Sequence, residues 1–245
     1  MNRLVPDRRG LRPPDHGADP FPPRRDGAVA VLFDVDGTLV DDAGRLSRIM
    51  DEAFAAAGLE SPGRARIMSV IGLSLPEMVE DLGRGVSRDR LDKIISGYRL
   101  RFEDALTGGE DPPTFPGAGT MLRRLRMAGL PLALTTGKSR IGLDHALETL
   151  GWRGLFDAIQ CAEGNPSKPD PTMVHKALWD LRRTPAQAVL VGDTVWDMEM
   201  ARRAGIPAIG VGWGYHAPDH LLSAGAVAIA RDFGHLGAML IERAT

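Results

Sequence analysis

The segment VLFDVDGTLV, residues Val31–Val40, runs from an apolar stretch into two acidic residues and a glycine. Side chains two positions apart in a strand share a face, so Asp34 and Asp36 are expected to point the same way where the apolar run ends. Two carboxylates buried together are unfavourable unless a divalent metal binds them, or one serves as nucleophile and the other as proton donor. Gly37 lets the chain turn close to an anion, and the Thr38 hydroxyl can hold one carboxylate. The alternative is an ordinary Asp-Gly turn with both acids in solvent.

Further apolar runs follow this segment, separated by stretches with helical periodicity. Because the runs are continuously apolar, we expect strands that are buried on both faces. Strands that alternate with helices predict an α/β fold with a doubly wound, Rossmann-like parallel sheet, which binds ligands beyond the carboxyl ends of its strands. The expected strands are Val29–Val35, Leu130–Thr135, Ala158–Ala162, Ala188–Val191, Ile206–Val211 and Ala226–Ala230.

The region from residue 42 to residue 113 contains no strand pattern. Apolar residues at helical spacing form one stripe from Leu46 to Ala57 and another from Leu91 to Phe102. We therefore expect an all-helical cap of residues 42–113, inserted into an α/β core of residues 28–41 and 114–245. An insertion beside the carboxyl ends of the strands is placed to act as a lid.

Two further segments place groups that can bind an anion at predicted strand ends. In ALTTGKS, the strand ends in Thr135 and Thr136 and Gly137 opens a helix, so that a hydroxyl and backbone N–H groups face the anion. In SKPDP, the prolines limit where Lys168 can point. Taken singly, these segments are also consistent with helix capping and with a solvated lysine.

The segment VLVGDTVWD adds two more acids. Asp193 follows a buried strand, and Asp197 lies one helical turn further on. Both could interact with the helix N-terminus, or one could bind magnesium while the other holds its waters. Because the carboxyl ends of parallel strands meet at one edge of a sheet, all four segments are expected to converge. The combination favours acids for a metal, with a threonine and a lysine for a phosphoryl group.

Composition limits the classes of function. The chain has 245 residues, 43% hydrophobic and 25% charged, typical of a soluble domain. A net charge of −2 excludes a nucleic-acid binder driven by bulk charge, and no apolar run is long enough to span a membrane. The single cysteine, Cys161, excludes an internal disulfide and points to a reducing compartment, so we expect a cytoplasmic protein. Residues 1–27, rich in proline and arginine, are expected to form a disordered extension.

Together the motifs resemble the haloacid dehalogenase superfamily, in its branch with a helical cap and phosphoglycolate phosphatase-like members. The resemblance covers the chain from about Ala28 to near the C-terminus. The residues that carry it are Asp34 and Asp36 of DVDGT, Thr136 of LTTGK, Lys168 of SKPDP, and Asp193 and Asp197 of GDTVWD.

The resemblance implies a Mg²⁺-dependent phosphatase that hydrolyses a small, phosphoglycolate-like phosphomonoester through an aspartyl-phosphate. Asp34 would be the nucleophile, while Asp36 would protonate the leaving oxygen and later deprotonate the attacking water. The metal would be held by the Asp34 carboxylate, the Asp36 backbone carbonyl and Asp193, with Asp197 in support.

The same resemblance assigns the transferring oxygens to Thr136 and Lys168, with Thr136 favoured over Thr135 because it directly precedes the Gly-Lys pair. The cap loop Gly72, Leu73, Ser74 and Leu75 would contribute to specificity. A sugar phosphomutase of the same superfamily remains the enzyme alternative, although the apolar Leu75 argues against a second phosphate. A non-catalytic phospho-acceptor module is the alternative from another class. The expected partner is a small phosphate ester, not a nucleic acid or a membrane, and the protein would be a monomer or a homodimer.

Overall fold

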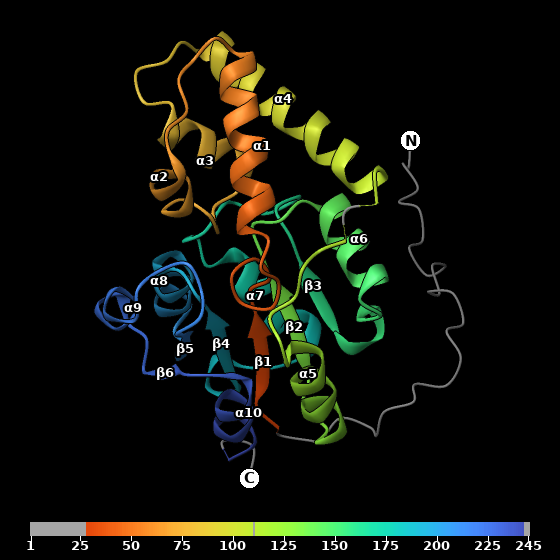
Figure 1. Cartoon of the computed structure of the whole chain (residues 1–245). Helices are drawn as coiled ribbons and strands as arrows, with labels where there is room; N and C mark the ends of the chain where they lie inside the picture. Colours follow the sequence, from red (N-terminus) through yellow and green to blue (C-terminus); the bar gives the residue numbers. More distant parts are fainter. Residues whose placement is uncertain (1–27, 110, 243–245) are drawn as a thin grey trace, which may run out of the picture.

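The computed structural model describes residues 28–109 and 111–242, so the predicted extension of residues 1–27 lies outside the described residues. A parallel sheet of six strands, in the order β3-β2-β1-β4-β5-β6, forms the centre of the molecule (Figure 1). The strands are β1 (Ala30–Phe33), β2 (Leu132–Thr135), β3 (Ala158–Gln160), β4 (Ala188–Gly192), β5 (Ala208–Val211) and β6 (Ala228–Ala230). Each lies on a predicted apolar run; β4 extends one residue further than predicted, and the others are shorter.

Helices cover both faces of this sheet. On one face, Val31 and Phe33 of β1 pack with apolar residues of α5, α6 and α10, whereas Ala30 and Leu32 pack on the other face with α7, α8 and α9. These helices are α5 (Ala118–Met127), α6 (Arg140–Thr149), α7 (Thr172–Leu181), α8 (Val195–Ala204), α9 (Pro218–Ala224) and α10 (Phe233–Glu242), with two short 3₁₀ turns, η1 (Arg153–Leu155) and η2 (Pro185–Gln187). Burial on both faces explains why the strands are continuously apolar. The predicted doubly wound α/β fold is confirmed.

The first four helices after β1 form a separate cluster above the carboxyl ends of the strands, here called the cap (Figure 1). They are α1 (Ala43–Ala56), α2 (Arg64–Met68), α3 (Leu75–Leu82) and α4 (Arg88–Thr107). Their apolar stripes meet in a core of their own, in which Ile49, Met50 and Ile94 are fully buried. The described residues of this stretch contain helices and isolated β-bridges but no strand, as the sequence predicted. The exact division into core and cap at residues 42 and 113 stays a prediction.

Helix length and hydropathy determine whether a helix can span a membrane. None of the helices within residues 28–109 and 111–242 is both long enough and apolar enough to cross a bilayer.

Candidate active site

The topology gathers the four sequence motifs at one edge of the sheet. Strand β1 pairs with β2 on one side and with β4 on the other, so the residues that follow these three strands become neighbours. This is where the strand order changes direction, the usual ligand-binding position in such a sheet. Asp34 follows β1, Thr136 follows β2, and Asp193 follows β4, while Lys168 comes from the loop after β3. The predicted convergence is therefore seen in the structure.

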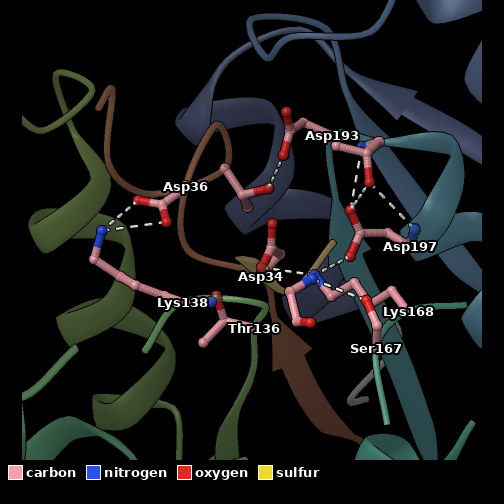
Figure 2. A network of polar contacts seen from close by, with 11 residues as sticks. Asp34, Asp36, Thr136, Lys138, Ser167, Lys168, Asp193 and Asp197 are labelled. Carbon is pink, nitrogen blue, oxygen red and sulfur yellow. Dashed lines mark hydrogen bonds and ion pairs between the residues drawn. The ribbon is translucent and has the colours of Figure 1, made fainter. Parts of the chain in front are cut away.

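Three acidic side chains form a tight cluster at this edge. Carboxylate oxygens of Asp34, Asp193 and Asp197 all lie within 4.8 Å of one another, and all three residues are buried. Lys168 joins two of them, because its Nζ lies 2.7 Å from Asp34 Oδ1 and 2.7 Å from Asp197 Oδ1 (Figure 2). Lys168 itself is buried, so the solvated lysine considered from the sequence is wrong.

Asp193 and Asp197 are held by different local structures. The Thr38 hydroxyl donates to Asp193 Oδ1 at 2.9 Å, and the backbone N–H of Tyr215 donates to Asp193 Oδ2 at 2.9 Å. The expectation that Thr38 holds a carboxylate is thus met, and the carboxylate is that of Asp193. Asp197 Oδ2 accepts from the backbone N–H of Thr194 at 3.1 Å and from its hydroxyl at 2.6 Å, in a capping box at the start of α8.

Asp36 does not share the direction of Asp34, contrary to the prediction from strand alternation. Strand β1 ends at Phe33, so the two-residue repeat of a strand does not extend to either acid. The Asp36 carboxylate instead accepts two hydrogen bonds from Lys138 Nζ, at 2.9 and 3.2 Å, on the side away from the acidic cluster (Figure 2). The two acids therefore face different cations, although both are buried.

The segment after β2 forms the wall opposite the acidic cluster. The Thr136 hydroxyl accepts from the backbone N–H of Lys138 at 3.2 Å, and both residues line a cavity that also contains Asp34. Thr135 is buried but does not line this cavity. Helix α6 begins at Arg140 rather than at Gly137, because the Ser139 side chain caps it by accepting from Gly142 N. Gly137 is thus part of a short loop before the helix.

The cavity, of about 210 Å³, lies between this edge of the sheet and the cap. Of the predicted specificity loop, Gly72, Leu73 and Leu75 line the cavity. Ser74 does not: its hydroxyl donates to Glu77 within the cap, and its backbone N–H donates to Ser167 Oγ of the core at 2.8 Å. Most of the remaining wall is apolar and comes from the cap. Its apolar side chains include Leu46, Ile71, Met78, Tyr98 and Phe102, and the cap also contributes the charged residues Arg99 and Glu103.

The three acids of the cluster have Lys168 as their cation, and this excess of negative charge shifts the pKa values of the buried groups. Burial raises the pKa of Asp34 to about 7, and Lys168 offsets only part of this effect. Burial also raises the pKa of Asp193 well above its usual value, and the charges of Asp34 and Asp197 add to the rise. Burial alone would lower the pKa of Lys168, but Asp197 and Asp34 raise it above its usual value. A bound cation would relieve the repulsion among these acids.

The donor atoms fit a hard divalent cation such as Mg²⁺. All are carboxylate oxygens, which is the ligand type that Mg²⁺ prefers. Asp34 Oδ2 is buried and has no hydrogen-bond partner among the described residues, so it is available to a ligand. The cluster contains Asp34 and Asp193 as predicted, together with Asp197, while the contribution expected of the Asp36 backbone carbonyl stays a prediction.

A family model described as haloacid dehalogenase-like hydrolase matches residues 31–211. The chain belongs to the haloacid dehalogenase-like hydrolase family. The matched region includes the acidic cluster, Lys168 and the whole cap, so the resemblance inferred from the motifs is confirmed. The prediction of an enzyme, and specifically a hydrolase, is confirmed as well.

Known proteins similar to this haloacid dehalogenase-like hydrolase cover most of its length. It is 33% identical over 190 residues to the phosphoglycolate phosphatase of Rhodobacter capsulatus, an alignment that covers 74% of this chain and 83% of that protein. It is 32% identical over 189 residues to the phosphoglycolate phosphatase of Yersinia pseudotuberculosis, covering 76% and 82%. The crystal structure of a hydrolase from Pseudomonas syringae matches with a TM-score of 0.79 at 24% identity, covering 89% of this chain and 100% of that one, and so shares its fold.

Sequence reasoning missed two charged residues of the site in this hydrolase. Lys138 was noticed only as part of the Gly-Lys string, and Asp42 only as the start of the cap. Lys138 Nζ lies 3.1 Å from Asp42 Oδ2, in addition to its bonds with Asp36. The available signal was the position of Lys138 directly after a strand-end glycine at the same sheet edge as the acids.

Proposed function

We propose that this hydrolase is a Mg²⁺-dependent phosphatase that hydrolyses a small, phosphoglycolate-like phosphomonoester through an aspartyl-phosphate. The observation that carries the proposal is the environment of Asp34. Its carboxylate is buried at the base of the cavity, with Lys168 beside Oδ1 and no protein partner for Oδ2. An unpartnered carboxylate oxygen next to a cation is suited to attack an anionic phosphoryl group. The names of the two relatives support phosphoglycolate as the first substrate to test.

The first half of the reaction transfers the phosphoryl group to Asp34. Asp34 Oδ2 attacks phosphorus and the bond to the leaving oxygen breaks, while Asp36 gives that oxygen a proton. Burial raises the pKa of Asp36, against the influence of Lys138, which helps this carboxyl to carry a proton. Lys168, the Thr136 hydroxyl and the backbone of Gly137 bind the oxygens of the transferring group.

The second half regenerates the enzyme. Asp36 removes a proton from a water molecule, the water oxygen attacks phosphorus, and the bond to Asp34 breaks to release phosphate. The cap excludes other water molecules from the cavity during these steps.

The metal site would be formed by Asp34, Asp193 and the Asp36 backbone carbonyl, with Asp197 in support. When bound, Mg²⁺ would neutralise charge, so that an anionic nucleophile can approach an anionic substrate. In this chain, Thr38 and the Tyr215 N–H orient Asp193 for that role, and Thr194 orients Asp197.

The proposal is tested by phosphate release from a panel of phosphomonoesters that includes phosphoglycolate, with Mg²⁺ or with EDTA. We expect turnover in the wild type with Mg²⁺, at least a 1,000-fold loss in Asp34→Asn, and no loss in the matched control Asp92→Asn, which changes an exposed acid of α4. Turnover that persists in Asp34→Asn or in EDTA would contradict the proposed mechanism.

A sugar phosphomutase remains the second candidate within the superfamily. It predicts exchange between glucose phosphate isomers without net release of phosphate. A phospho-acceptor module would instead take up one phosphoryl group and stop. A cytoplasmic location and a monomeric or dimeric state remain predictions.

A further inference from the structure

A network of four charged side chains lies beside the acidic cluster. Lys138 bridges Asp36 and Asp42, and Asp42 in turn binds Arg45. Arg45 Nε donates to Asp42 Oδ1 at 2.8 Å, and Arg45 Nη2 donates to Asp42 Oδ2 at 2.7 Å. Two acids thus face two cations, so the network is charge-balanced although all four residues are buried.

An aromatic side chain of the cap covers this network. Lys138 Nζ lies 5.3 Å from the centroid of the Phe102 ring, and the Arg45 guanidinium lies 5.5 Å from it. Both positions allow cation–π attraction. Phe102 is buried and therefore shields the ion pairs from water, which strengthens them.

Lys138 controls where the Asp36 carboxylate points. Asp36 belongs to the loop that follows β1, and Lys138 is the only side chain among the described residues that donates a hydrogen bond to its carboxylate. Lys138 is also held from the other side, because its Nζ donates to Asp42 Oδ2. Arg45 in turn holds Asp42 in place. In this arrangement Asp36 lines the cavity and stays apart from the acidic cluster.

We infer that Lys138 is a positioning residue for Asp36, held in place by Asp42 and Arg45, and that it aims the proton donor at the leaving oxygen of the substrate. The inference rests on the proposed function, in which Asp36 is that donor. Lys138 acts through Asp36 and not on phosphorus, so its removal should impair protonation of the leaving group far more than attack by Asp34.

Substrates with different leaving groups separate these two effects. An alkoxide needs a proton to leave, whereas p-nitrophenolate leaves without one. The parameter kcat/KM reports on the steps up to the first phosphoryl transfer, so it isolates the half-reaction in which Asp36 is the acid. The test compares kcat/KM for p-nitrophenyl phosphate with kcat/KM for the best alkyl phosphate of the panel.

For Lys138→Met we expect a loss of about 100-fold on the alkyl phosphate, a typical effect of a misplaced proton donor, and less than about 5-fold on p-nitrophenyl phosphate. Because the single variant leaves two buried carboxylates facing each other, the double variant Lys138→Met/Asp42→Asn restores charge balance. We expect it to recover thermal stability but not alkyl phosphatase activity. Lys93→Met, which changes an exposed lysine of α4, serves as the matched control.

Equal losses on the two substrates in a folded Lys138 variant, or no loss at all, would overturn the positioning role. Recovery of alkyl phosphatase activity in the double variant would overturn it too, since stability alone would then explain the defect. Turnover that persists in Asp34→Asn, or no turnover of either substrate by the wild-type protein, would overturn the proposed function and this inference with it.

Discussion

The Asp193 side chain packs directly against two glycines. A Cβ atom added to Gly37, whose φ is +89°, would lie 2.1 Å from Asp193 Oδ2, and one added to Gly214 would lie 2.1 Å from Asp193 Cβ. Neither distance is possible without movement of the backbone or of the aspartate. Each glycine therefore leaves the space that the buried Asp193 side chain occupies. Two loops far apart in the sequence thus determine the geometry of the proposed metal site.

Gly214→Ala should displace Asp193 and weaken the metal site. We expect a destabilisation of about 1–3 kcal/mol from overpacking and a Mg²⁺ requirement raised at least 10-fold. Thermal unfolding and Mg²⁺ titration of phosphatase activity measure the two effects. Gly154→Ala is the control, because nothing lies within 4 Å of its added Cβ, and it should change neither quantity. Similar results for the two variants would contradict a role of Gly214 in placing Asp193.

The raised pKa of Asp34 predicts how pH alters the effect of Mg²⁺. Its pKa rises from an ordinary value of 3.8 to about 7 in the metal-free protein. The protonated form is thus favoured by folding, so this group's contribution to stability is fully present below pH 3.8 and is lost as pH rises through 7. Mg²⁺ requires the ionised form, so protons compete with the metal below about pH 7.

We therefore expect excess Mg²⁺ to raise Tm more at pH 8 than at pH 5.5, relative to EDTA. Thermal scans at both pH values measure this difference, which should shrink in Asp34→Asn. An equal rise in Tm at both pH values would show that Asp34 does not titrate in this range.

At the level of secondary structure, the start of helix α8 contributes both to the stability of the fold and to the geometry of the site. Its first turn has a capping box in which Thr194 and Asp197 exchange hydrogen bonds, and the remaining Asp197 oxygen binds Lys168. Asp197 thus serves the helix and the lysine together: its interpretation as a capping residue is confirmed, while its role at a magnesium site stays a prediction. A second capping box, at Thr184 before η2, lies at the exposed surface and touches none of the site residues named above.

Thr194→Val should cost about 1–2 kcal/mol of unfolding free energy, because it removes a buried cap. Thr184→Val should cost less, since its partners remain accessible to water. Urea unfolding measures both values. Only Thr194→Val should also reduce kcat/KM, because Asp197 loses the hydroxyl that orients it; a larger effect at Thr184 would contradict this account.

Across the whole molecule, the cap is docked onto the core through its loop at residues 72–74. Ser74 N–H donates to Ser167 Oγ, and a Cβ on Gly137 would lie 2.6 Å from the carbonyl oxygen of Leu73. One hydrogen bond and close packing of this kind can break and re-form. The described structure is a closed form, because the cap loop lies against the core beside the cavity.

Ser167→Ala should favour opening of the cap. Loss of one hydrogen bond of about 0.5–1.5 kcal/mol predicts a roughly 2- to 10-fold increase in the open population. Hydrogen exchange of the peptide that contains residues 72–75 should accelerate by a similar factor, while Ser223→Ala, an exposed helix serine, should leave it unchanged. Unaltered exchange in Ser167→Ala would mean that apolar contacts alone hold the cap.

Much of the fold was predictable, because a parallel sheet buried on both faces requires continuous apolar strands and helices require apolar residues at their own spacing. The strands β1 to β6 and the cap helices α1 and α4 appeared where these patterns predicted them. The convergence of Asp34, Thr136, Lys168 and Asp193 was predictable for the same reason, because parallel strands end at one edge.

The direction and the partners of each side chain were not predictable in this way. The sequence pattern placed Asp34 and Asp36 on one face, but β1 ends at Phe33 and the two acids turn to different lysines. Lys138 and Asp36 are 102 positions apart, and Thr38 and Asp193 are 155 positions apart. Local periodicity reports how each segment is buried, so it is sufficient for the elements and their order. The choice of partner for a buried charge depends on which loops meet once the elements have packed, and that is a property of the folded chain.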